Sequence, residues 1–149
     1  MNVTVQTKKK EEILQAFKFR HATKLFDASR KITEEDFAFI LETGRLSPSS
    51  IGFEPWKFLI VQNPDFRQRL SEVSSGAQRQ LATASHFIVI LARTDASYSS
   101  PYAAYMLKEV QGMPDDVFKL TSEAYGKFQN NQGLLQNAKT LFDWASKQT

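Results

Sequence analysis

Cysteine is absent from the 149 residues, and its absence excludes several kinds of chemistry. Without thiols the sequence provides no disulfide, no cysteine nucleophile, and no thiolate ligands for zinc or an iron–sulfur cluster. Histidine is also scarce, because the two histidines, His21 and His86, lie too far apart in sequence to form a local metal-binding motif. We therefore expect neither a metal site nor cysteine-based catalysis.

Long hydrophobic runs are missing as well. No apolar segment approaches the length of about 20 residues that a membrane-spanning helix needs. Met1–Glu12 is mostly polar and lacks the apolar core of a secretory signal. We therefore expect a cytoplasmic protein with no membrane partner.

The excess of positive charge is small. The sequence has 19 Lys and Arg against 16 Asp and Glu, and much of the net charge of +3 comes from Lys8–Lys10. No basic face interleaved with aromatic residues is visible, so a nucleic-acid partner is not expected. A hydrophobic content of 42% and a charged content of 23% are typical of globular proteins. The chain is long enough for a single domain with its own core.

Helical and strand patterns alternate along this domain. Thr33 followed by three acidic residues predicts a helix start, and Asn63-Pro64 predicts another. Residues 1–9 are expected to form a loose N-terminal arm, and residues 74–83 an irregular segment. The remaining patterns predict helices and strands over these segments: helices at 8–19, in two runs after 96, and at 134–149; strands at 56–61 and 87–92.

The C-terminal part has two features that are unusual for a complete domain. The last predicted helix has no stop signal, and its apolar face still continues at Ala145. The strand at 87–92 is uninterrupted apolar, a pattern typical of a strand covered on both faces, whereas a sheet of two strands is rarely stable alone. We therefore expect residues 1–149 to be one domain, truncated after Thr149, that pairs with a partner chain, with later residues, or with both.

Polar residues gather in two stretches that can bind a ligand. In the first, Arg20 offers a planar fork of donors, Lys24 a point charge and Thr23 a hydroxyl, a set that suits a phosphate or a flavin. The alternative is a solvated basic turn, with Arg20 in a salt bridge at the end of a helix. The second stretch, Ser47–Gly52, offers hydroxyls and backbone amides, and its alternative is a plain connecting turn.

Read together, these stretches resemble the FMN-dependent nitroreductase family. The resemblance extends from Ile13 to Thr149, and four motifs occur in the order found in that family. The motifs are Arg20-His21-Ala22-Thr23-Lys24-x-Phe26-Asp27, Ser47-Pro48-Ser49-Ser50-x-x-x-x-Pro55-Trp56-x-Phe58, Ala84-Ser85-His86, and Trp144-Ala145-x-Lys147-Gln148.

This resemblance implies an α+β, nitroreductase-like fold, with a central mixed or antiparallel sheet flanked by helices. It also implies an interlocked homodimer with FMN bound at the subunit interface, and C-terminal strands that this chain lacks. The implied cofactor-binding residues come from one subunit at the first stretch and from the other at the second. They are Arg20, His21, Ala22, Lys24, Pro48, Ser49, Ser50, Gln80 and Gln148.

The activity implied by the resemblance is hydride transfer from NAD(P)H through bound FMN to a nitroaromatic or quinone acceptor, with ping-pong kinetics. A flavin performs such chemistry itself, so no catalytic side chain is expected. Two alternatives remain. One is a non-catalytic or incomplete flavin-binding dimer without turnover, and the other is a small basic module whose Arg20 and Lys24 contact nucleic-acid phosphates.

Overall fold

The computed structural model describes the backbone of residues 3–149 and the side chains from Thr7 onward. The chain forms two compact units, and each is described here by itself. The first comprises the chain up to Lys31 together with Gln62–Phe87, and the second comprises Ile32–Val61 and Ile88–Thr149. Among the described residues, no helix combines the length and apolar character needed to cross a membrane.

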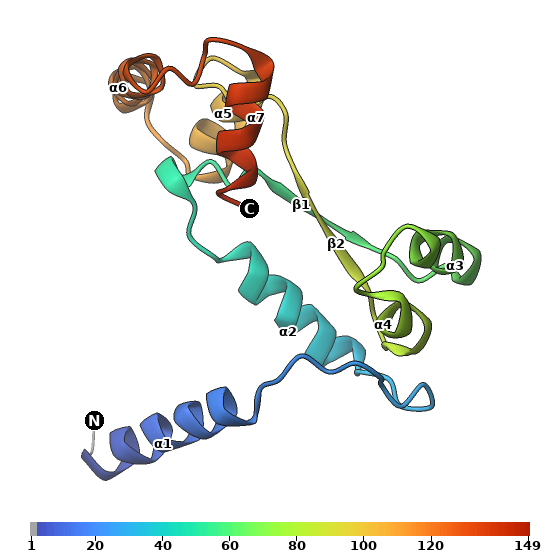
Figure 1. The fold of residues 1–149 in the computed structure, drawn as a ribbon. Coiled ribbons are helices and arrows are strands. Elements are labelled where there is room, and N and C mark those ends of the chain that lie inside the picture. The colour runs from blue at the N-terminus through green and yellow to red at the C-terminus, as the bar shows by residue number, and fades with distance from the viewer. Residues whose placement is uncertain (1–2) are drawn as a thin grey trace. The chain divides into compact units, whose positions relative to one another are not determined.

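The first unit is helical, and the second combines helices with a small sheet (Figure 1). The helices of the first unit are α1 (Val3–Phe19), α3 (Pro64–Glu72) and α4 (Gln78–Thr83). The elements of the second unit are α2 (Glu34–Arg45), the 3₁₀ turn η1 (Ser50–Gly52), β1 (Trp56–Ile60), β2 (Ile88–Ala92), α5 (Pro101–Tyr105), the π-helical turn η2 (Met106–Val110), α6 (Asp115–Asn131) and α7 (Ala138–Ser146).

Side-chain caps start several of these helices. The hydroxyl of Thr33 accepts a hydrogen bond from the backbone N–H of Asp36 at 3.1 Å, so the predicted start of α2 is confirmed. Asn63 accepts from the N–H of Phe66 at 2.9 Å, with Pro64 as the first helical residue of α3. Such caps satisfy N–H groups that have no partner inside the helix.

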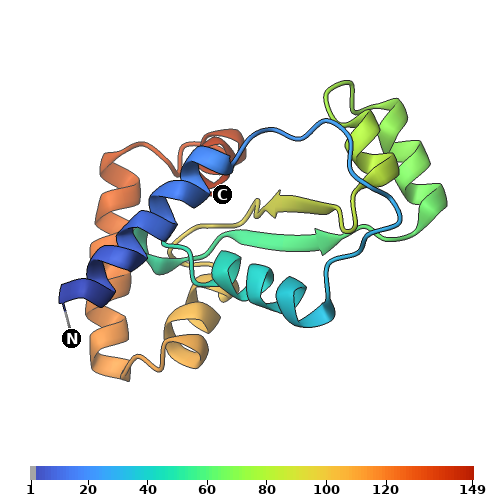
Figure 2. The ribbon, with the colours of Figure 1, turned by 90° about the horizontal axis from the view of Figure 1, so that it is seen from below.

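The sheet of the second unit consists of β1 and β2, which run antiparallel and lie side by side in Figure 2, whereas they overlap in the view of Figure 1. Their register pairs Trp56 with Ala92 and Ile60 with Ile88. The predicted α+β class and both predicted strands are confirmed. The predicted coverage of the second strand on both faces is not confirmed for this chain by itself, because the side chain of Ile90 is 53% exposed. An apolar run indicates that a strand can be buried, and only the elements packed against it decide how much of it is.

Three helices differ from the predicted pattern, two of them in where they begin and one in being present at all. Helix α1 begins at Val3, so residues 3–9 of the expected arm are helical, while residues 1–2 lie outside the described part. Helix α4 occupies part of a segment expected to be irregular, because its Leu81 is fully buried and the gain from packing outweighs the polar composition around it. Helix α7 begins only at Ala138, where Asn137 caps it through the N–H of Thr140.

The core of the second unit is centred on Phe53, Ala103 and Leu107. Phe53 has no exposed surface, and its ring meets that of Tyr125 edge to face, with 5.4 Å between the ring centroids. Trp144 packs against the same core from α7. The loop before β1 is therefore anchored in the core by a large aromatic side chain.

We expect Phe53→Ala to lower the free energy of unfolding by about 3–5 kcal/mol, because it removes a fully buried ring and leaves a cavity. The matched control is Phe39→Ala on α2, whose side chain is 72% exposed and whose loss should cost about 0.5 kcal/mol or less. Urea unfolding monitored by circular dichroism measures both. Equal losses for the two variants would contradict this description of the core.

Candidate functional site

The first predicted ligand-binding stretch follows α1 directly. The last helical hydrogen bond runs from the N–H of Arg20 to the carbonyl of Ala16 at 3.0 Å, and the chain then continues in irregular conformation. The Nδ1 atom of His21 lies 3.1 Å from the carbonyl oxygen of Phe19, and its Nε2 atom lies 3.3 Å from the Thr23 hydroxyl. Since a carbonyl only accepts, Nδ1 carries the proton in this arrangement.

Two hydrogen bonds tie this stretch to α4. Gln80 donates its Nε2 hydrogen to the carbonyl of Thr23 at 3.2 Å, and the N–H of Phe26 donates to the Thr83 hydroxyl at 3.1 Å. Next to these bonds lies a cavity of about 210 Å³. It is lined by Lys24, Ser75, Gly76, Gln78, Arg79 and Gln80.

Arg20 and Lys24, the cations of this stretch, form no ion pairs with described residues. Among the residues whose side chains are described, none forms an ion pair with Arg20 or Lys24, so the alternative of a helix-end salt bridge for Arg20 finds no support. Arg79 is a second cation, besides Lys24, in the lining of the cavity. Exposed cations beside amide and hydroxyl donors make a chemically suitable site for an anionic group such as a phosphate.

Helix α4 is held in place by Arg67 of α3. The guanidinium of Arg67 donates to the carbonyls of Leu81 and Ala84, at 3.3 and 2.8 Å, near the C-terminal end of α4. It also donates to the side-chain oxygen of Gln62 at 2.7 Å. Burial lowers the pKa of Arg67, but arginine remains charged and caps the carbonyls that the helix itself leaves unpaired.

The second predicted stretch precedes β1 and lies in the second unit. The Ser49 hydroxyl accepts a hydrogen bond from the N–H of Glu54 at 2.8 Å, and the N–H of Ser50 donates to Oε1 of Gln148 at 3.2 Å. No described residue bonds the Nε2 group of Gln148, so its hydrogens remain available. A cavity of about 180 Å³ is lined here by Gly44, Ser47, Pro48, Trp56, Phe58, Ile90, Gln148 and Thr149.

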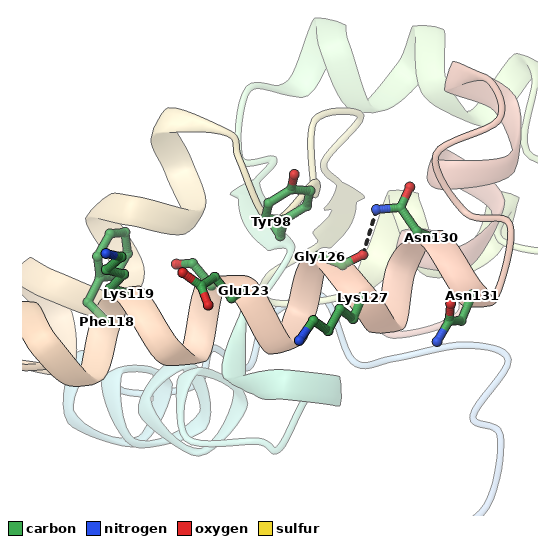
Figure 3. A pocket seen from close by; sticks show the side chains of 9 residues that line it. Tyr98, Phe118, Lys119, Glu123, Gly126, Lys127, Asn130 and Asn131 are labelled. Atoms are coloured by element: carbon green, nitrogen blue, oxygen red, sulfur yellow. Dashed lines mark hydrogen bonds between the residues drawn. The ribbon is translucent and has the colours of Figure 1, made fainter.

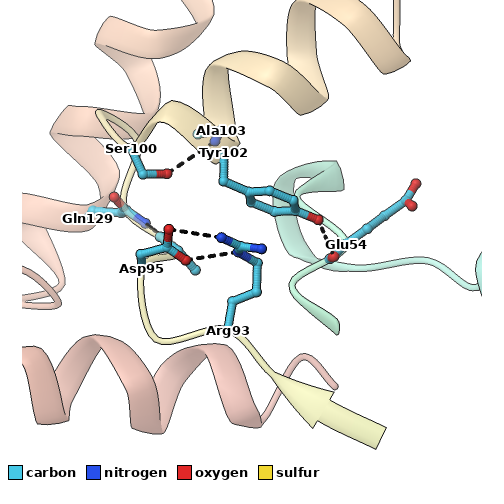
Figure 4. Close-up of polar contacts among 8 residues, drawn as sticks. Glu54, Arg93, Asp95, Ser100, Tyr102, Ala103 and Gln129 are labelled. Carbon is cyan, nitrogen blue, oxygen red and sulfur yellow. Dashed lines mark hydrogen bonds and ion pairs between the residues drawn. The ribbon is translucent and has the colours of Figure 1, made fainter. Parts of the chain in front are cut away.

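A cluster around Tyr102 secures the end of this loop (Figure 4). The Tyr102 hydroxyl donates to the carbonyl of Glu54 at 2.7 Å, and the guanidinium of Arg93 lies 3.8 Å from the centroid of the Tyr102 ring. Arg93 also forms a two-pronged ion pair with Asp95, whose pKa the hydrogen bonds from Arg93 lower. Gln129, which is fully buried, bonds the backbone just after this pair by accepting from the N–H of Tyr98 at 2.7 Å.

A larger cavity, of about 620 Å³, lies along α6 and contains none of the predicted site residues (Figure 3). Asn130 donates to the carbonyl of Gly126 within it at 2.8 Å. A Cβ atom at Gly126 would lie 2.9 Å from the Tyr98 ring, so a larger residue there requires that ring to shift. The cavity is lined by Tyr98, Phe118, Lys119, Ser122, Glu123, Gly126, Lys127, Asn130 and Asn131.

The predicted cofactor residues thus fall into two groups. The residues Arg20, His21, Ala22, Lys24 and Gln80 lie in the first unit, where Gln80 and Lys24 share a cavity. The residues Pro48, Ser49, Ser50 and Gln148 lie in the second, where Gln148 bonds Ser50 and shares a cavity with Pro48.

Sequence reasoning missed Arg79, although a cation in a polar segment near Gln80 was a usable signal. It also missed the role of Tyr102, which bonds a residue 48 positions away in sequence, because no local pattern marks such a contact.

Comparison with known proteins gives concordant results. A family model described as "Nitroreductase family" matches residues 17–145. The Bacillus subtilis (strain 168) protein named "Putative NAD(P)H nitroreductase YfkO" is 57% identical over 143 residues, and the match covers 94% of this chain and 65% of that protein. The chain thus spans about 65% of the length of this curated relative.

Solved structures agree with the sequence matches. A "putative nitroreductase in complex with FMN" from Exiguobacterium sibiricum 255-15 superimposes with a TM-score of 0.67 at 26% identity, over 91% of this chain and 62% of that one. A nitroreductase-like protein from Streptococcus mutans gives a TM-score of 0.74 at 18% identity, over 93% and 66% of the two chains, and supports the fold alone.

Proposed function

The chain belongs to the nitroreductase family, and from this premise we propose that the protein is an FMN-dependent oxidoreductase. It transfers a hydride from NAD(P)H, through bound FMN, to a nitroaromatic or quinone acceptor. The observation that carries the proposal is that Arg20 and Lys24 are exposed cations without ion-pair partners among the described residues, and that Lys24 shares a cavity with Gln80. The resemblance noted in the sequence is confirmed by the family match.

The first group of residues fits the anionic end of FMN. Arg20 can form two parallel hydrogen bonds to phosphate oxygens, whereas Lys24 contributes a point charge. His21 and Ala22 lie between these two cations in the chain, and the ring of His21 is already oriented by the carbonyl of Phe19. Gln80 supplies a polar amide next to Lys24 in the cavity of the first unit.

The second group fits the flat ring system of a flavin. Trp56, Phe58 and Ile90 give its cavity apolar walls, and Gln148 brings a free amide donor to the same cavity. Pro48 and Ser50 belong to the loop beside it, and Ser49 keeps that loop closed through Glu54. A mostly apolar cavity with a few fixed polar groups is typical of cofactor sites.

When bound, FMN supplies the hydride chemistry itself. The residues of this chain would bind and orient it, and a cation such as Lys24 would stabilise negative charge on the reduced flavin if its side chain reached the ring edge rather than the phosphate. No side chain has to act as nucleophile or general acid for this role. In the proposed reaction NAD(P)H and the acceptor use one site in turn, and this alternation gives ping-pong kinetics.

A homodimer completes this proposal, with the two groups of residues contributed by different subunits to each FMN. Support comes from the apolar stripe of α1, where Ile13, Leu14 and Phe17 are 57–69% exposed. We also propose that residues 1–149 belong to one domain. The paired strands β1 and β2 of the second unit precede and follow residues 62–87 in the sequence, so this part of the first unit is inserted between them. A cytoplasmic location fits an enzyme that consumes NAD(P)H.

We expect the purified protein to bind FMN and Arg20→Ala to weaken that binding by about tenfold to a hundredfold, because a charge-assisted hydrogen-bond donor to the phosphate is lost. Quenching of FMN fluorescence on titration measures the affinity, and circular dichroism checks the fold. Arg30→Ala is the matched control, an exposed arginine ten residues further along that should leave the affinity unchanged. An Arg20→Ala protein that binds FMN like the wild type would refute the assigned role of Arg20.

Turnover is tested by NAD(P)H oxidation in the presence of FMN and a quinone. We expect parallel lines in double-reciprocal plots at several acceptor concentrations, since the oxidised nucleotide leaves before the acceptor binds. A reaction without the protein provides the background rate. A flat trace from protein that retains FMN would favour the alternative of a non-catalytic flavin-binding dimer.

The dimer is tested by light scattering coupled to size-exclusion chromatography. We expect a dimeric mass for the wild type and a shift toward the monomer for Phe17→Glu, because burying an unpaired carboxylate in an interface is unfavourable. Lys18→Glu on the same helix changes the charge more, yet it should leave the mass unchanged because Lys18 does not belong to the apolar stripe. A monomeric wild type at micromolar concentration would contradict the proposal.

A further inference from the structure

The loop before β1 is held by side chains from three distant elements. The Tyr125 hydroxyl, on α6, donates to the carbonyl of Ile51 at 3.0 Å. The Nε2 group of Gln111, directly after η2, donates to the carbonyl of Gly52 at 2.8 Å. With the Tyr102 bond to Glu54, three carbonyls within four residues are each bound by one side-chain donor.

The backbone of this loop is in an unfavourable conformation. Ile51 has φ of 64° and ψ of 7°, and Glu54 has φ of 46°, both in the left-handed region. A β-branched residue such as isoleucine rarely adopts this conformation, because its Cβ atom crowds the following carbonyl. Such a conformation persists only where the surrounding structure holds it, and the three donated hydrogen bonds supply that restraint.

The two donors are held in different ways. The Tyr125 ring packs edge to face on the fully buried Phe53, and burial raises the pKa of Tyr125, so its phenol stays protonated and able to donate. Gln111 fits closely against Gly52, where an added Cβ atom would lie 3.0 Å from its Nε2 atom. Tyr125 is therefore oriented by packing as well as by its hydrogen bond, whereas the exposed Gln111 is oriented by its bond to Gly52.

The restrained carbonyls directly follow the residues expected to contact the flavin. Ser50 is the first residue of η1, and its N–H bonds Gln148, while Ser49 bonds Glu54 across the same turn. A shift of the backbone at Ile51 therefore moves Ser50 and breaks the contact with Gln148. The conformation of Pro48–Ser50 depends in this way on groups that lie outside the candidate site.

We propose that Tyr125 and Gln111 are positioning residues that hold the Pro48–Ser50 backbone in its flavin-accepting conformation. The proposal rests on the proposed function for its ligand, and on the contacts of the second unit for its geometry. It assigns no contact with the flavin to either side chain. Their effect reaches the cofactor only through the carbonyls of Ile51 and Gly52.

The test uses the double variant Tyr125→Phe, Gln111→Met, which removes both donors and nearly preserves side-chain volume. The matched control is Tyr105→Phe, which removes the hydroxyl of a tyrosine on α5 that is 55% exposed. Hydrogen–deuterium exchange of the protein without FMN reports on peptides that cover residues 46–56. FMN titration and the absorption spectrum of the bound flavin report on the site.

We expect faster exchange in the 46–56 peptides of the double variant, with the peptides of α6 unchanged. FMN affinity should fall by about tenfold, in line with the loss of two neutral hydrogen bonds, and the absorption bands of bound flavin should shift. The control variant should match the wild type in all three measurements. Equal exchange at 46–56 in the double variant and the wild type would overturn the proposal, as would equal FMN affinity despite faster exchange.

The exchange measurement separates this proposal from the proposed function. If the wild type binds no FMN, the proposed function fails, and exchange alone then decides whether Tyr125 and Gln111 hold the loop. Faster exchange in the double variant would support the positioning role, and unchanged exchange would end it. Gln111→Met and Tyr125→Phe as single variants provide the same reading if the double variant does not fold.

Discussion

The side chain of Phe53 is fully buried among Ala103, Leu107 and Tyr125, and this burial draws the loop before β1 into the core of the second unit. The residues next to the buried ring are partly buried, and a peptide group without a hydrogen-bond partner is costly to bury. Tyr102 and Gln111, together with Tyr125, supply the missing partners. The core and the candidate cofactor loop are thus parts of one arrangement.

The first unit presents the opposite situation. Around Arg20 and Lys24 the polar groups are exposed, and the cations have no ion-pair partners among the described residues. The backbone of this stretch is fixed through Gln80 and Thr83 of α4. A fixed backbone with unpaired cationic side chains can bind an anion without first breaking internal salt bridges, which lowers the free-energy cost of binding.

The two groups of residues offer different kinds of interaction to a ligand. The first unit offers charge, which acts at some distance and tolerates small errors of placement, whereas the second offers shape and single hydrogen bonds. In the proposed function, recognition of a flat ring in the cavity lined by Trp56 and Phe58 needs a loop that does not move. The strained conformation of Ile51 is understandable in this light, because the side-chain donors that offset the strain also make the loop rigid.

The sequence alone determined the family, the α+β class, both strands and the capped starts of α2 and α3, because local caps, periodicity and short motifs carry that information. It also predicted the two stretches of the proposed site. Tertiary structure alone decided the rest. The burial of Leu81 stabilises α4 as a helix, whereas Ile90 is exposed. The Tyr125 hydroxyl donates a hydrogen bond to the carbonyl of Ile51, 74 residues away in sequence. Each outcome depends on which distant surfaces meet, and no local pattern encodes that.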